Sequence, residues 1–403
     1  MKRVVIPSNV HFMYEHALAQ LELRQGFGLQ PRLDPLNPWE MRCELNGRAP
    51  DVLARAAYVG EIDGVQSVYA ELIRPKYRGG QYNRTRSENQ YLTHWIYPYK
   101  GKFHPQMIRA ILNAVGARPG WTVLDPFCGS GTTLLECQLL GIDSIGVDIS
   151  PLCVLLSKVK TQAWRFAREI REAVFTITAR GDAHPDHVRS DNWEPQEVAD
   201  FIQVARMVTC SDAARRRRDP SSYFSKNLTS MLESVEAMAR AKSAFGISFG
   251  GVRVLQGDSR KMDGLGIRPQ SVDAVVTSPP YSIALDYVDN DEHALRALGY
   301  DTERLRDDFI GVRGRGAKTK LACYEQDMKD SLKCISRALR PGGVLVMIIG
   351  DVTISGEESV TTEDVASWAG ATGMVLNRKL PKIVWGLYNV IKDEKILFFC
   401  KEG

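Results

Sequence analysis

The segment Val123–Thr133, V-L-D-P-F-C-G-S-G-T-T, joins a short apolar strand to a glycine-rich turn and the first residues of a helix. Gly129 and Gly131 permit close approach of a ligand and unusual backbone angles, and the helix start presents free N–H groups. A P-loop is excluded because no lysine follows the glycines, and a dinucleotide-binding fingerprint is excluded because its third glycine is missing. The segment therefore predicts a binding site for a nucleotide-like ligand, with a plain glycine-rich turn as the alternative.

Two later apolar segments each end in an acidic residue. Ser144–Asp148 reads as a second strand, and Val252–Asp258 reads as a third. A carboxylate at Asp148 can accept hydrogen bonds from both hydroxyls of a ribose. Because the carboxyl ends of parallel strands meet at one edge of a sheet, these acids and the glycine-rich turn predict a nucleoside site there.

The apolar run Val272–Thr277 ends in Ser278-Pro279-Pro280-Tyr281. Each proline ring fixes φ at about −65° and removes an N–H donor, so the backbone here is stiff. The Ser278 hydroxyl and nearby carbonyls offer acceptors for an amino group, and Tyr281 offers a flat face for stacking. The tetrapeptide therefore predicts a site for a planar ring that carries an amine, although most Pro-Pro pairs are plain turns. Tyr287 is either a second wall of this site or an ordinary packing residue.

In combination, these motifs resemble the S-adenosylmethionine-dependent amino-methyltransferases of DNA, over roughly residues 95–160 and 250–403. The resemblance implies S-adenosyl-L-methionine as cofactor, Asp148 as the ribose acid, Asp258 as the adenine-side acid, and residues 97–106 as the lining of the methionine end. The cofactor-binding residues that it implies are Tyr97, Lys100, Phe103, His104, Asp125, Pro126, Phe127, Cys128, Gly129, Ser130, Gly131, Thr132, Thr133, Asp148, Ile149, Asp258 and Ser259. It also implies that Ser278, Pro279, Pro280 and Tyr281 are catalytic.

The chemistry of an exocyclic amine fits the tetrapeptide. The nitrogen lone pair is drawn into the ring, and acceptance of its N–H bonds by Ser278 and a carbonyl such as that of Pro279 favours a pyramidal, nucleophilic nitrogen. The methyl sulfonium is already activated, so direct transfer needs mainly positioning and electrostatics. Methylation at ring carbon 5 needs a cysteine nucleophile, usually after a proline, and the chain has no Pro-Cys pair. A target in duplex DNA must be flipped out of the helix to reach such a site.

We therefore expect a site-specific DNA methyltransferase that acts on cytosine N4, because a serine at the first position of the tetrapeptide is associated in this family mostly with that product. Adenine N6 is the nearest alternative, with the same site and mechanism. Methylation of an RNA base amine, with residues 1–90 binding RNA, is a further alternative. A protein that binds nucleic acid without turnover is the non-enzymatic one.

The order of elements predicts an α/β protein of the class I methyltransferase (Rossmann-like) fold, a doubly wound and mostly parallel sheet with a terminal antiparallel strand. We expect an N-terminal accessory region at 1–90, which is a candidate for target recognition, and a methyltransferase domain at 91–403. The domain contains a helical insert at 160–250 and a basic, glycine-rich loop at 311–320. Strands are expected near 121–125, 144–148, 252–256, 273–277, 344–349, 375–384 and 395–400.

Three basic segments are candidates for target recognition and for contacts with DNA. The loop at 311–320 either contacts DNA or closes the pocket, with a disordered surface loop as the alternative. We expect contacts from Arg215, Arg216, Arg217 and Arg218 in the insert and from Arg313, Arg315 and Lys318 in the basic loop. The third segment contains Arg74, Lys76, Arg78, Arg84 and Arg86. A solvated helix end is the competing interpretation of the four arginines.

The composition is that of a globular protein and does not indicate which class of partner it binds. The chain has 403 residues, 44% of them hydrophobic, and a formal net charge of +4. Its eight cysteines include no C-x-x-C pair, which predicts reduced thiols, no disulfide frame and no metal site. No signal peptide or membrane span is evident, so we expect a cytoplasmic, nucleoid-associated protein of a prokaryote. Its expected partner is double-stranded DNA, and a cognate restriction endonuclease is a candidate partner. The sequence does not determine whether that endonuclease exists, nor the oligomeric state.

Overall fold

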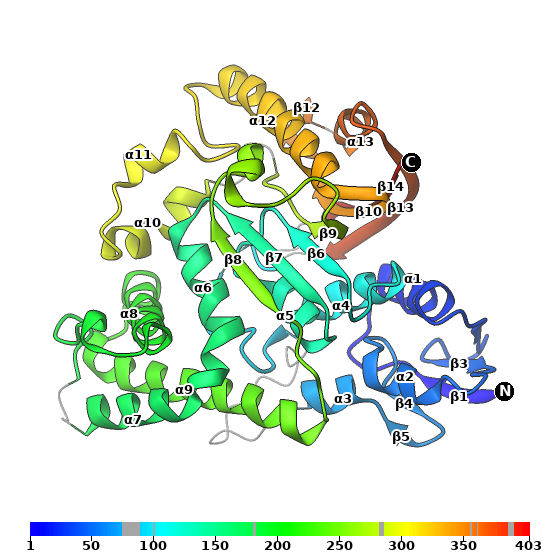
Figure 1. Cartoon of the computed structure of the whole chain (residues 1–403), viewed down its shortest axis with the longest axis horizontal. Helices are drawn as coiled ribbons and strands as arrows, with labels where there is room; N and C mark the ends of the chain where they lie inside the picture. The colour runs from blue at the N-terminus through cyan, green and yellow to red at the C-terminus, as the bar shows by residue number, and fades with distance from the viewer. Residues whose placement is uncertain are drawn as a thin grey trace.

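The structure is a computed structural model (Figure 1). It describes residues 1–74, 89–99, 101–179, 183–281, 286–354, 357–360, 362–385 and 391–403. Lys100, Lys76, Arg78, Arg84 and Arg86, which the sequence analysis singled out, lie outside the described residues.

A seven-stranded sheet forms the centre of the molecule, with the strand order β13-β14-β10-β9-β6-β7-β8. The strands are β6 (Thr122–Asp125), β7 (Asp143–Asp148), β8 (Val252–Gln256), β9 (Val272–Thr277), β10 (Leu339–Gly350), β13 (Met374–Trp385) and β14 (Ile391–Lys401). The pairs from β10 to β8 are parallel, and β14 runs antiparallel to both of its neighbours. This order confirms the predicted class I methyltransferase fold. The order reverses at β6, and such a switch point opens a crevice at the carboxyl ends of the strands.

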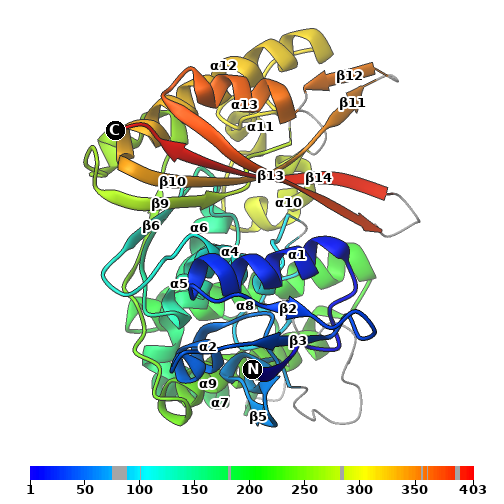
Figure 2. The same ribbon diagram turned by 90° about the vertical axis from the view of Figure 1, so that its right-hand side faces the viewer.

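Helices cover both faces of this sheet (Figure 2), which explains why its strands are apolar on both sides. One face packs against α4 (Pro105–Ala114) and α5 (Thr132–Leu139), with Val276 and Ile348 among its core residues. The other face packs against α12 (Ala317–Ala338) and α13 (Thr362–Gly370), with Val275 and Met347 in its core. Alternate residues of β9 and β10 thus enter different cores, as the two-residue period of a strand requires.

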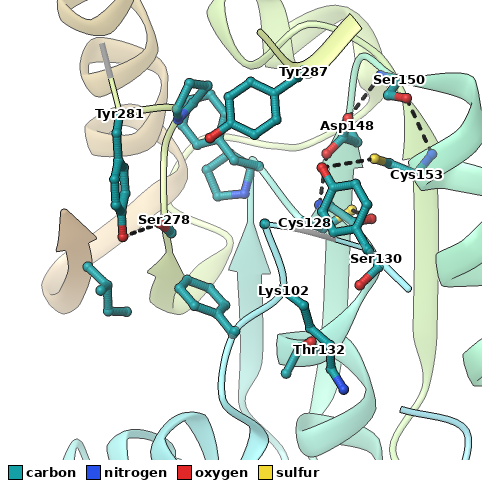
Figure 3. Close-up of a pocket in the computed structure, with 18 of the residues that line it drawn as sticks. Lys102, Cys128, Ser130, Thr132, Asp148, Ser150, Cys153, Ser278, Tyr281 and Tyr287 are labelled. Atoms are coloured by element: carbon teal, nitrogen blue, oxygen red, sulfur yellow. Dashed lines mark hydrogen bonds between the residues drawn. The ribbon is translucent and has the colours of Figure 1, made fainter. Parts of the chain in front are cut away.

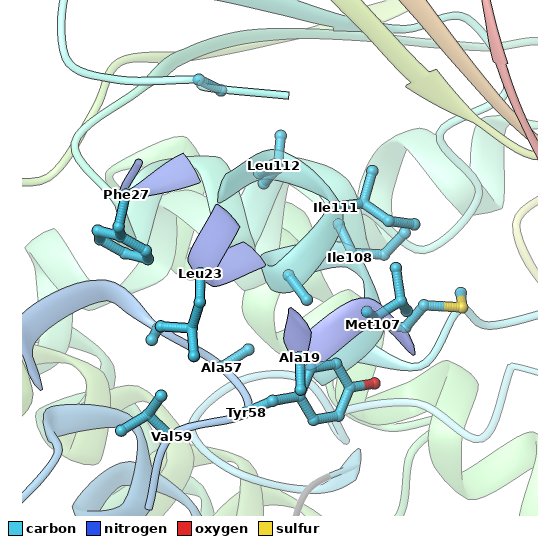
Figure 4. Close-up of a cluster of buried hydrophobic side chains, with 14 of the residues drawn as sticks. Ala19, Leu23, Phe27, Ala57, Tyr58, Val59, Met107, Ile108, Ile111 and Leu112 are labelled. Atoms are coloured by element: carbon cyan, nitrogen blue, oxygen red, sulfur yellow. The ribbon is translucent and has the colours of Figure 1, made fainter. Parts of the chain in front are cut away.

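Residues 1–74 form a second, smaller sheet with the order β2-β3-β1-β4-β5. Its strands are β1 (Lys2–Val5), β2 (Arg32–Leu33), β3 (Glu40–Cys43), β4 (Glu61–Ile62) and β5 (Val65–Gln66), and its helices are α1 (Met13–Leu21, continued by a π-helix at Glu22–Gly26), α2 (Ala49–Arg55) and α3 (Val68–Ile73). Leu23 and Tyr58 of this region share one core with Ile108 and Ile111 of α4 (Figure 4).

Buried polar contacts reinforce that junction. The Glu22 carboxylate is fully buried and accepts hydrogen bonds from the backbone N–H groups of Ala57 (2.7 Å) and Tyr58 (3.1 Å) and from Asn113 Nδ2 (2.7 Å). Burial of an ionisable side chain costs free energy unless its oxygens accept hydrogen bonds. These hydrogen bonds therefore join three elements: the π-helix, the segment that follows α2, and helix α4.

Several helices separate β7 from β8. They are α6 (Pro151–Gln162), α7 (Ala167–Thr178), α8 (Gln196–Arg216) and α9 (Pro220–Ala244), with 3-10 turns at Ala163–Phe166 and Ser190–Asn192. Helices α7, α8 and α9 occupy the segment 160–250, in which the sequence predicts a helical insert. The chain then forms a 3-10 helix at Ser259–Leu265 before β9, α10 (Tyr287–Ala297) and α11 (Thr302–Arg306) after it, and the hairpin β11 (Val352–Ile354) and β12 (Glu357–Val360).

The expected basic loop at 311–320 is corrected by the structure. Helix α12 begins at Ala317, so Lys318 lies in its first turn and only residues 311–316 lie outside a helix. Gly316, at φ +77°, ends the irregular segment, and buried Tyr324, Met328 and Leu332 follow at helical spacing. That apolar stripe outweighs the glycines as a determinant of local structure.

None of the helices formed by the described residues is both long enough and apolar enough to cross a bilayer.

Candidate functional site

A cavity of about 410 Å³ lies at the carboxyl ends of β6, β7 and β9 (Figure 3). Its volume is typical of small-molecule sites, roughly 300–1,000 Å³. We call the part lined by residues 126–132 and 148–153 the loop end, and the part lined by Ser278, Pro280, Tyr281, Lys382 and Glu394 the tetrapeptide end. The residues predicted from sequence that line the cavity are Phe103, His104, Pro126, Phe127, Cys128, Gly129, Ser130, Thr132, Asp148, Ile149, Asp258, Ser259, Ser278, Pro280, Tyr281 and the candidate wall residue Tyr287. Segments that are far apart in the chain thus meet at one cavity.

The turn at the loop end depends on its glycines. Gly129 and Gly131 have φ angles of +50° and +77°, in the left-handed region that disfavours a side chain. A Cβ atom at Gly131 would lie 2.7 Å from Ser157 Oγ, and one at Gly129 would lie 3.2 Å from the Tyr99 ring. The turn therefore packs too closely for other residues.

This turn leaves polar groups available to a ligand. Helix α5 begins at Thr132, and no side chain caps its N-terminus. The Ser130 and Thr132 hydroxyls line the cavity, are buried, and have no hydrogen-bond partner among the residues that the structure describes. Because buried polar groups normally have partners, unpaired hydroxyls beside free N–H groups fit an anionic or polar ligand at this end.

Asp148 connects the turn to the end of β7. Its Oδ2 accepts from the Gly129 N–H (2.8 Å) and its Oδ1 from the Ser150 N–H (2.9 Å). Burial raises the pKa of Asp148 to about 6, against the lowering effect of these hydrogen bonds. Asp148 lines the cavity, so its carboxylate can also face a ligand there.

Four predicted cofactor-binding residues lie behind the wall of the cavity. Asp125 is buried, and its Oδ1 accepts from Thr277 Oγ1 (2.6 Å) and from the Phe127 N–H (3.2 Å). It therefore links the glycine-rich turn to the end of β9. Tyr97 is also buried, and its hydroxyl donates to Asp291 Oδ1 at 3.4 Å. Gly131 and Thr133 likewise do not line the cavity.

Asp258 lines the cavity, but its carboxylate is already engaged. It caps the 3-10 helix at Ser259–Leu265 by accepting from the Arg260 N–H (2.9 Å), and the Arg260 guanidinium lies 2.8 Å from its Oδ2. Arg260 also bonds Asp327 Oδ1 at 2.8 Å. A ligand at this point meets an ion pair, where the sequence predicted a free acid.

The tetrapeptide is held by its own hydroxyls and by α12. Ser278 Oγ donates to the Tyr281 hydroxyl at 3.3 Å, and the Tyr324 hydroxyl donates to the Pro280 carbonyl at 2.8 Å. Pro279 is buried and does not line the cavity. Burial holds the pKa of Tyr281 well above its usual range, so its phenol stays neutral. Figure 3 shows Ser278 and Tyr281 on the side of the cavity away from Asp148 and Ser130.

Sequence reasoning missed much of the remaining wall, which consists of Tyr99, Gly101, Lys102, Met107, Ser150, Cys153, Gly257, Asp291, Phe309, Ile310, Ile348, Lys382 and Glu394. Tyr99, Gly101 and Lys102 lie within the segment 97–106, which was taken as a block. Ser150 and Cys153 could have been found, since a serine before a proline at a helix start is a capping signal. No local pattern marks Lys382 or Glu394.

The structure ties most of the predicted DNA-binding arginines to acids of the same chain. Arg215 donates to the Asn290 carbonyl and to Asp291, Arg216 and Arg218 pair with Asp212, and Arg313 pairs with Asp327 at 2.7 Å. Arg74, in the third basic segment, pairs with Glu71 at 2.7 Å. Arg217, Arg315 and Lys318 are exposed and make no ion pair with any described residue. These three are therefore the predicted basic residues that the fold leaves open to an external phosphate.

Among the described residues, no group of three or more His, Cys, Asp or Glu side chains could hold a metal ion.

The chain is similar to known methyltransferases over short segments. A family model described as DNA methylase matches residues 62–158. The Type II methyltransferase M.MjaII of Methanocaldococcus jannaschii is 49% identical over 71 residues, which is 18% of this chain and 13% of that protein. The Type II methyltransferase M.BsoBI of Geobacillus stearothermophilus is 37% identical over 83 residues, 21% of this chain and 16% of that protein.

A tRNA (guanine(10)-N2)-dimethyltransferase of Methanothermobacter thermautotrophicus is 41% identical over 51 residues, 13% of this chain and 15% of that protein. The chain thus matches only between 13% and 16% of the length of these curated relatives.

Proposed function

We propose that the chain transfers a methyl group from S-adenosyl-L-methionine to the N4 amine of cytosine in duplex DNA, because a family model described as DNA methylase matches residues 62–158 and the chain is similar to two Type II methyltransferases. The observation that carries the proposal is one cavity that joins an open helix N-terminus with unpaired hydroxyls to the tetrapeptide Ser278–Tyr281. The first end suits an amino-acid nucleoside, and the second suits an amine on a planar ring.

S-adenosylmethionine is the cofactor that the family and the fold imply, and the residues of the loop end fit it. Ser130, Thr132 and the free N–H groups of α5 would hold its methionine carboxylate. Asp148 would accept from the ribose hydroxyls, and Asp258 with Arg260 would border the adenine. When bound, the cofactor supplies an electrophilic methyl group on a positively charged sulfur.

The residues of the chain then have to position the target amine. Ser278 has acceptor lone pairs for an amine N–H, and neutral Tyr281 offers a face against which a flipped base stacks. The Tyr324 hydroxyl fixes the Pro280 carbonyl and with it the backbone of the tetrapeptide. Direct transfer to a positioned amine needs no covalent intermediate on the protein.

Two other products stay open within this proposal. Adenine N6 uses the same groups, since adenine also carries an exocyclic amine on a planar ring. Guanine N2 of RNA is favoured as a second candidate by the similarity to the tRNA (guanine(10)-N2)-dimethyltransferase. In the DNA case, we propose that the chain acts as a modification enzyme beside a cognate endonuclease.

Incubation of the purified protein with tritiated cofactor and unmethylated genomic DNA, followed by mass spectrometry of the nucleosides, tests the proposal. We expect 4-methylcytosine. A peak of 6-methyladenine would contradict the cytosine assignment, and incorporation into tRNA alone would contradict the DNA assignment. The Ser278→Ala variant serves as the control for activity at this site.

A further inference from the structure

The wall of the tetrapeptide end contains an ion pair that no sequence motif predicted. Lys382 of β13 lies opposite Glu394 of β14, and Glu394 lies opposite Gly350 of β10. Lys382 Nζ and Glu394 Oε2 are in direct contact. Their side chains are only 12% and 14% exposed, and both line the cavity. Ion pairs this buried carry a desolvation cost that a surface pair does not.

Glu394 lies beside the tetrapeptide. Gly350 has no side chain, and a Cβ atom there would be 3.4 Å from Glu394 Cγ and 3.6 Å from Tyr281 Cε2. The two side chains therefore approach each other over the bare backbone of Gly350. Since Tyr281 is bonded to Ser278, the Glu394 carboxylate belongs to the same part of the cavity as the Ser278 hydroxyl.

Lys382 is enclosed from the other side. Its Nζ lies 5.9 Å from the centroid of the Tyr14 ring, which α1 contributes, and His104 lines the same cavity. The ammonium is thus placed between the N-terminal helix and the Glu394 carboxylate. This placement keeps a positive charge next to the Glu394 carboxylate.

Two comparable ion pairs on the same strands do not line the cavity. Lys379 of β13 pairs with Glu363, whose side chain is 66% exposed, and Lys395 of β14 pairs with Asp351. An ion pair that only stabilises the hairpin can therefore lie outside the cavity wall. Lys382 and Glu394 occupy the wall of the cavity instead.

We propose that the Glu394 carboxylate accepts a hydrogen bond from the target amine, and that Lys382 holds this carboxylate in place. This inference rests on the proposed function. The tetrapeptide begins with a serine, so its own side chain brings no negative charge, and Glu394 supplies one from a strand more than a hundred residues later in the chain.

The movement of positive charge during methyl transfer gives this carboxylate a role. As the methyl carbon–sulfur bond breaks and the carbon–nitrogen bond forms, the positive charge moves to the amine nitrogen. A fixed anion next to that nitrogen stabilises the developing charge. The N–H proton of the product ammonium then passes to Glu394 Oε and leaves to water, which returns the carboxylate.

The experiment measures single-turnover methylation at saturating cofactor, together with cofactor Kd and Tm, for E394Q, K382M and the double exchange K382E/E394K. E363Q and K379M are the matched controls on the peripheral pair. We expect E394Q to slow the chemical step by about 10- to 100-fold, the range for a hydrogen bond to a charged group, with cofactor Kd unchanged. The exchange, which keeps an ion pair but moves the carboxylate away from Tyr281, should not restore the rate.

A wild-type single-turnover rate in E394Q, or full restoration of that rate in the exchange variant, would overturn the inference. The ion pair would then only stabilise the hairpin. If E394Q loses its thermal transition, the neutral pair K382Q/E394Q takes its place, with the same expected loss. Failure of the proposed function is seen separately, in the wild-type protein. Methylation of RNA alone by the wild type would overturn the DNA assignment, while the variants would still test Glu394 on that RNA.

Discussion

The two ends of the cavity obtain their chemistry in different ways. The loop end takes its polar groups from backbone N–H groups and short side chains of two segments that directly follow β6 and β7. The tetrapeptide end collects side chains from β9, α12, β13 and β14, which are brought together by the register of the sheet. The loop end is therefore a local structure, and the tetrapeptide end is a product of the whole fold.

This difference separates binding from reaction. Backbone groups in a rigid turn suit a ligand that must be held in the same way in every cycle. Side chains from several elements suit the positioning of an amine and the developing charge on it. Changes at the loop end should therefore alter cofactor affinity, and changes at the tetrapeptide end should alter the rate of transfer.

The largest effect is expected for Asp148→Ala. The change removes the acceptor for the Gly129 and Ser150 N–H groups and for a ribose, so cofactor Kd should rise by about 100-fold, as for loss of hydrogen bonds to a charged group. Isothermal titration measures it, with Asp143→Asn at the exposed start of the same strand as the control. An unchanged Kd would contradict the role of the loop end.

Tyr281→Ala should mainly affect the other end. Loss of a stacking face should lower the single-turnover rate by about 10- to 100-fold and leave cofactor Kd unchanged. Tyr281→Phe keeps the ring and loses only the hydrogen bond from Ser278, so its loss should be smaller. Equal losses in rate and affinity would mean that the tetrapeptide acts as a structural support of the whole cavity.

Cofactor affinity should depend on pH through Asp148. Burial raises the pKa of Asp148 to about 6, and the ionised carboxylate is the acceptor, so affinity should be full above that pH and fall as the pH drops below it. Binding titrations between pH 5 and 8 measure the profile. Burial also raises the pKa of Asp125 to about 6, but Asp125 lies behind the wall. Asp148→Asn should therefore abolish the dependence, and its persistence would assign it to Asp125.

Tyr324→Phe should produce a moderate effect at the tetrapeptide end. It removes the hydroxyl that donates to the Pro280 carbonyl at 2.8 Å. Loss of about 1 kcal/mol from a neutral hydrogen bond corresponds to a rate roughly fivefold lower, at unchanged cofactor Kd. A change in Kd instead would show that α12 also controls the loop end.

The smallest effect is expected for Arg315→Ala, outside both ends. Arg315 is exposed and makes no ion pair with a described residue, so its loss should reduce the salt dependence of DNA binding by about one unit of slope. Arg313→Ala should instead lower Tm, because Arg313 pairs with Asp327. The reverse result would show that the ion pair with Asp327 opens when DNA binds.

The same difference explains what the sequence could predict. The central strands were predictable because runs such as Val272–Thr277 are mostly apolar, and the glycine-rich turn because its geometry needs those residues locally. Lys382 and Glu394 could not be found, since their place in the cavity depends on a hairpin register that a shift of one residue would invert. Strands of two residues such as β2 and β4 carry too little pattern to be recognised.

The arginine run shows a related limit of reasoning from the sequence alone. A count of basic residues shows Arg215–Arg218 as a patch, but Asp212 and Asp291 fold next to it and take up most of its charge. Asp212 is close in sequence, on the preceding turn of α8, and could have been considered. Asp291 comes from α10, and only the tertiary structure brings it there.

The buried cluster around Glu22 limits where the chain can be divided into fragments that fold. A gene fragment that starts near residue 90 would leave Asn113 without its partner and would open the apolar side of α4 to water. The N-terminal residues therefore cannot be exchanged between relatives as a detachable module unless α4 is exchanged with them. Heating should melt both sheets in one cooperative transition, since neither has a core of its own on the shared side.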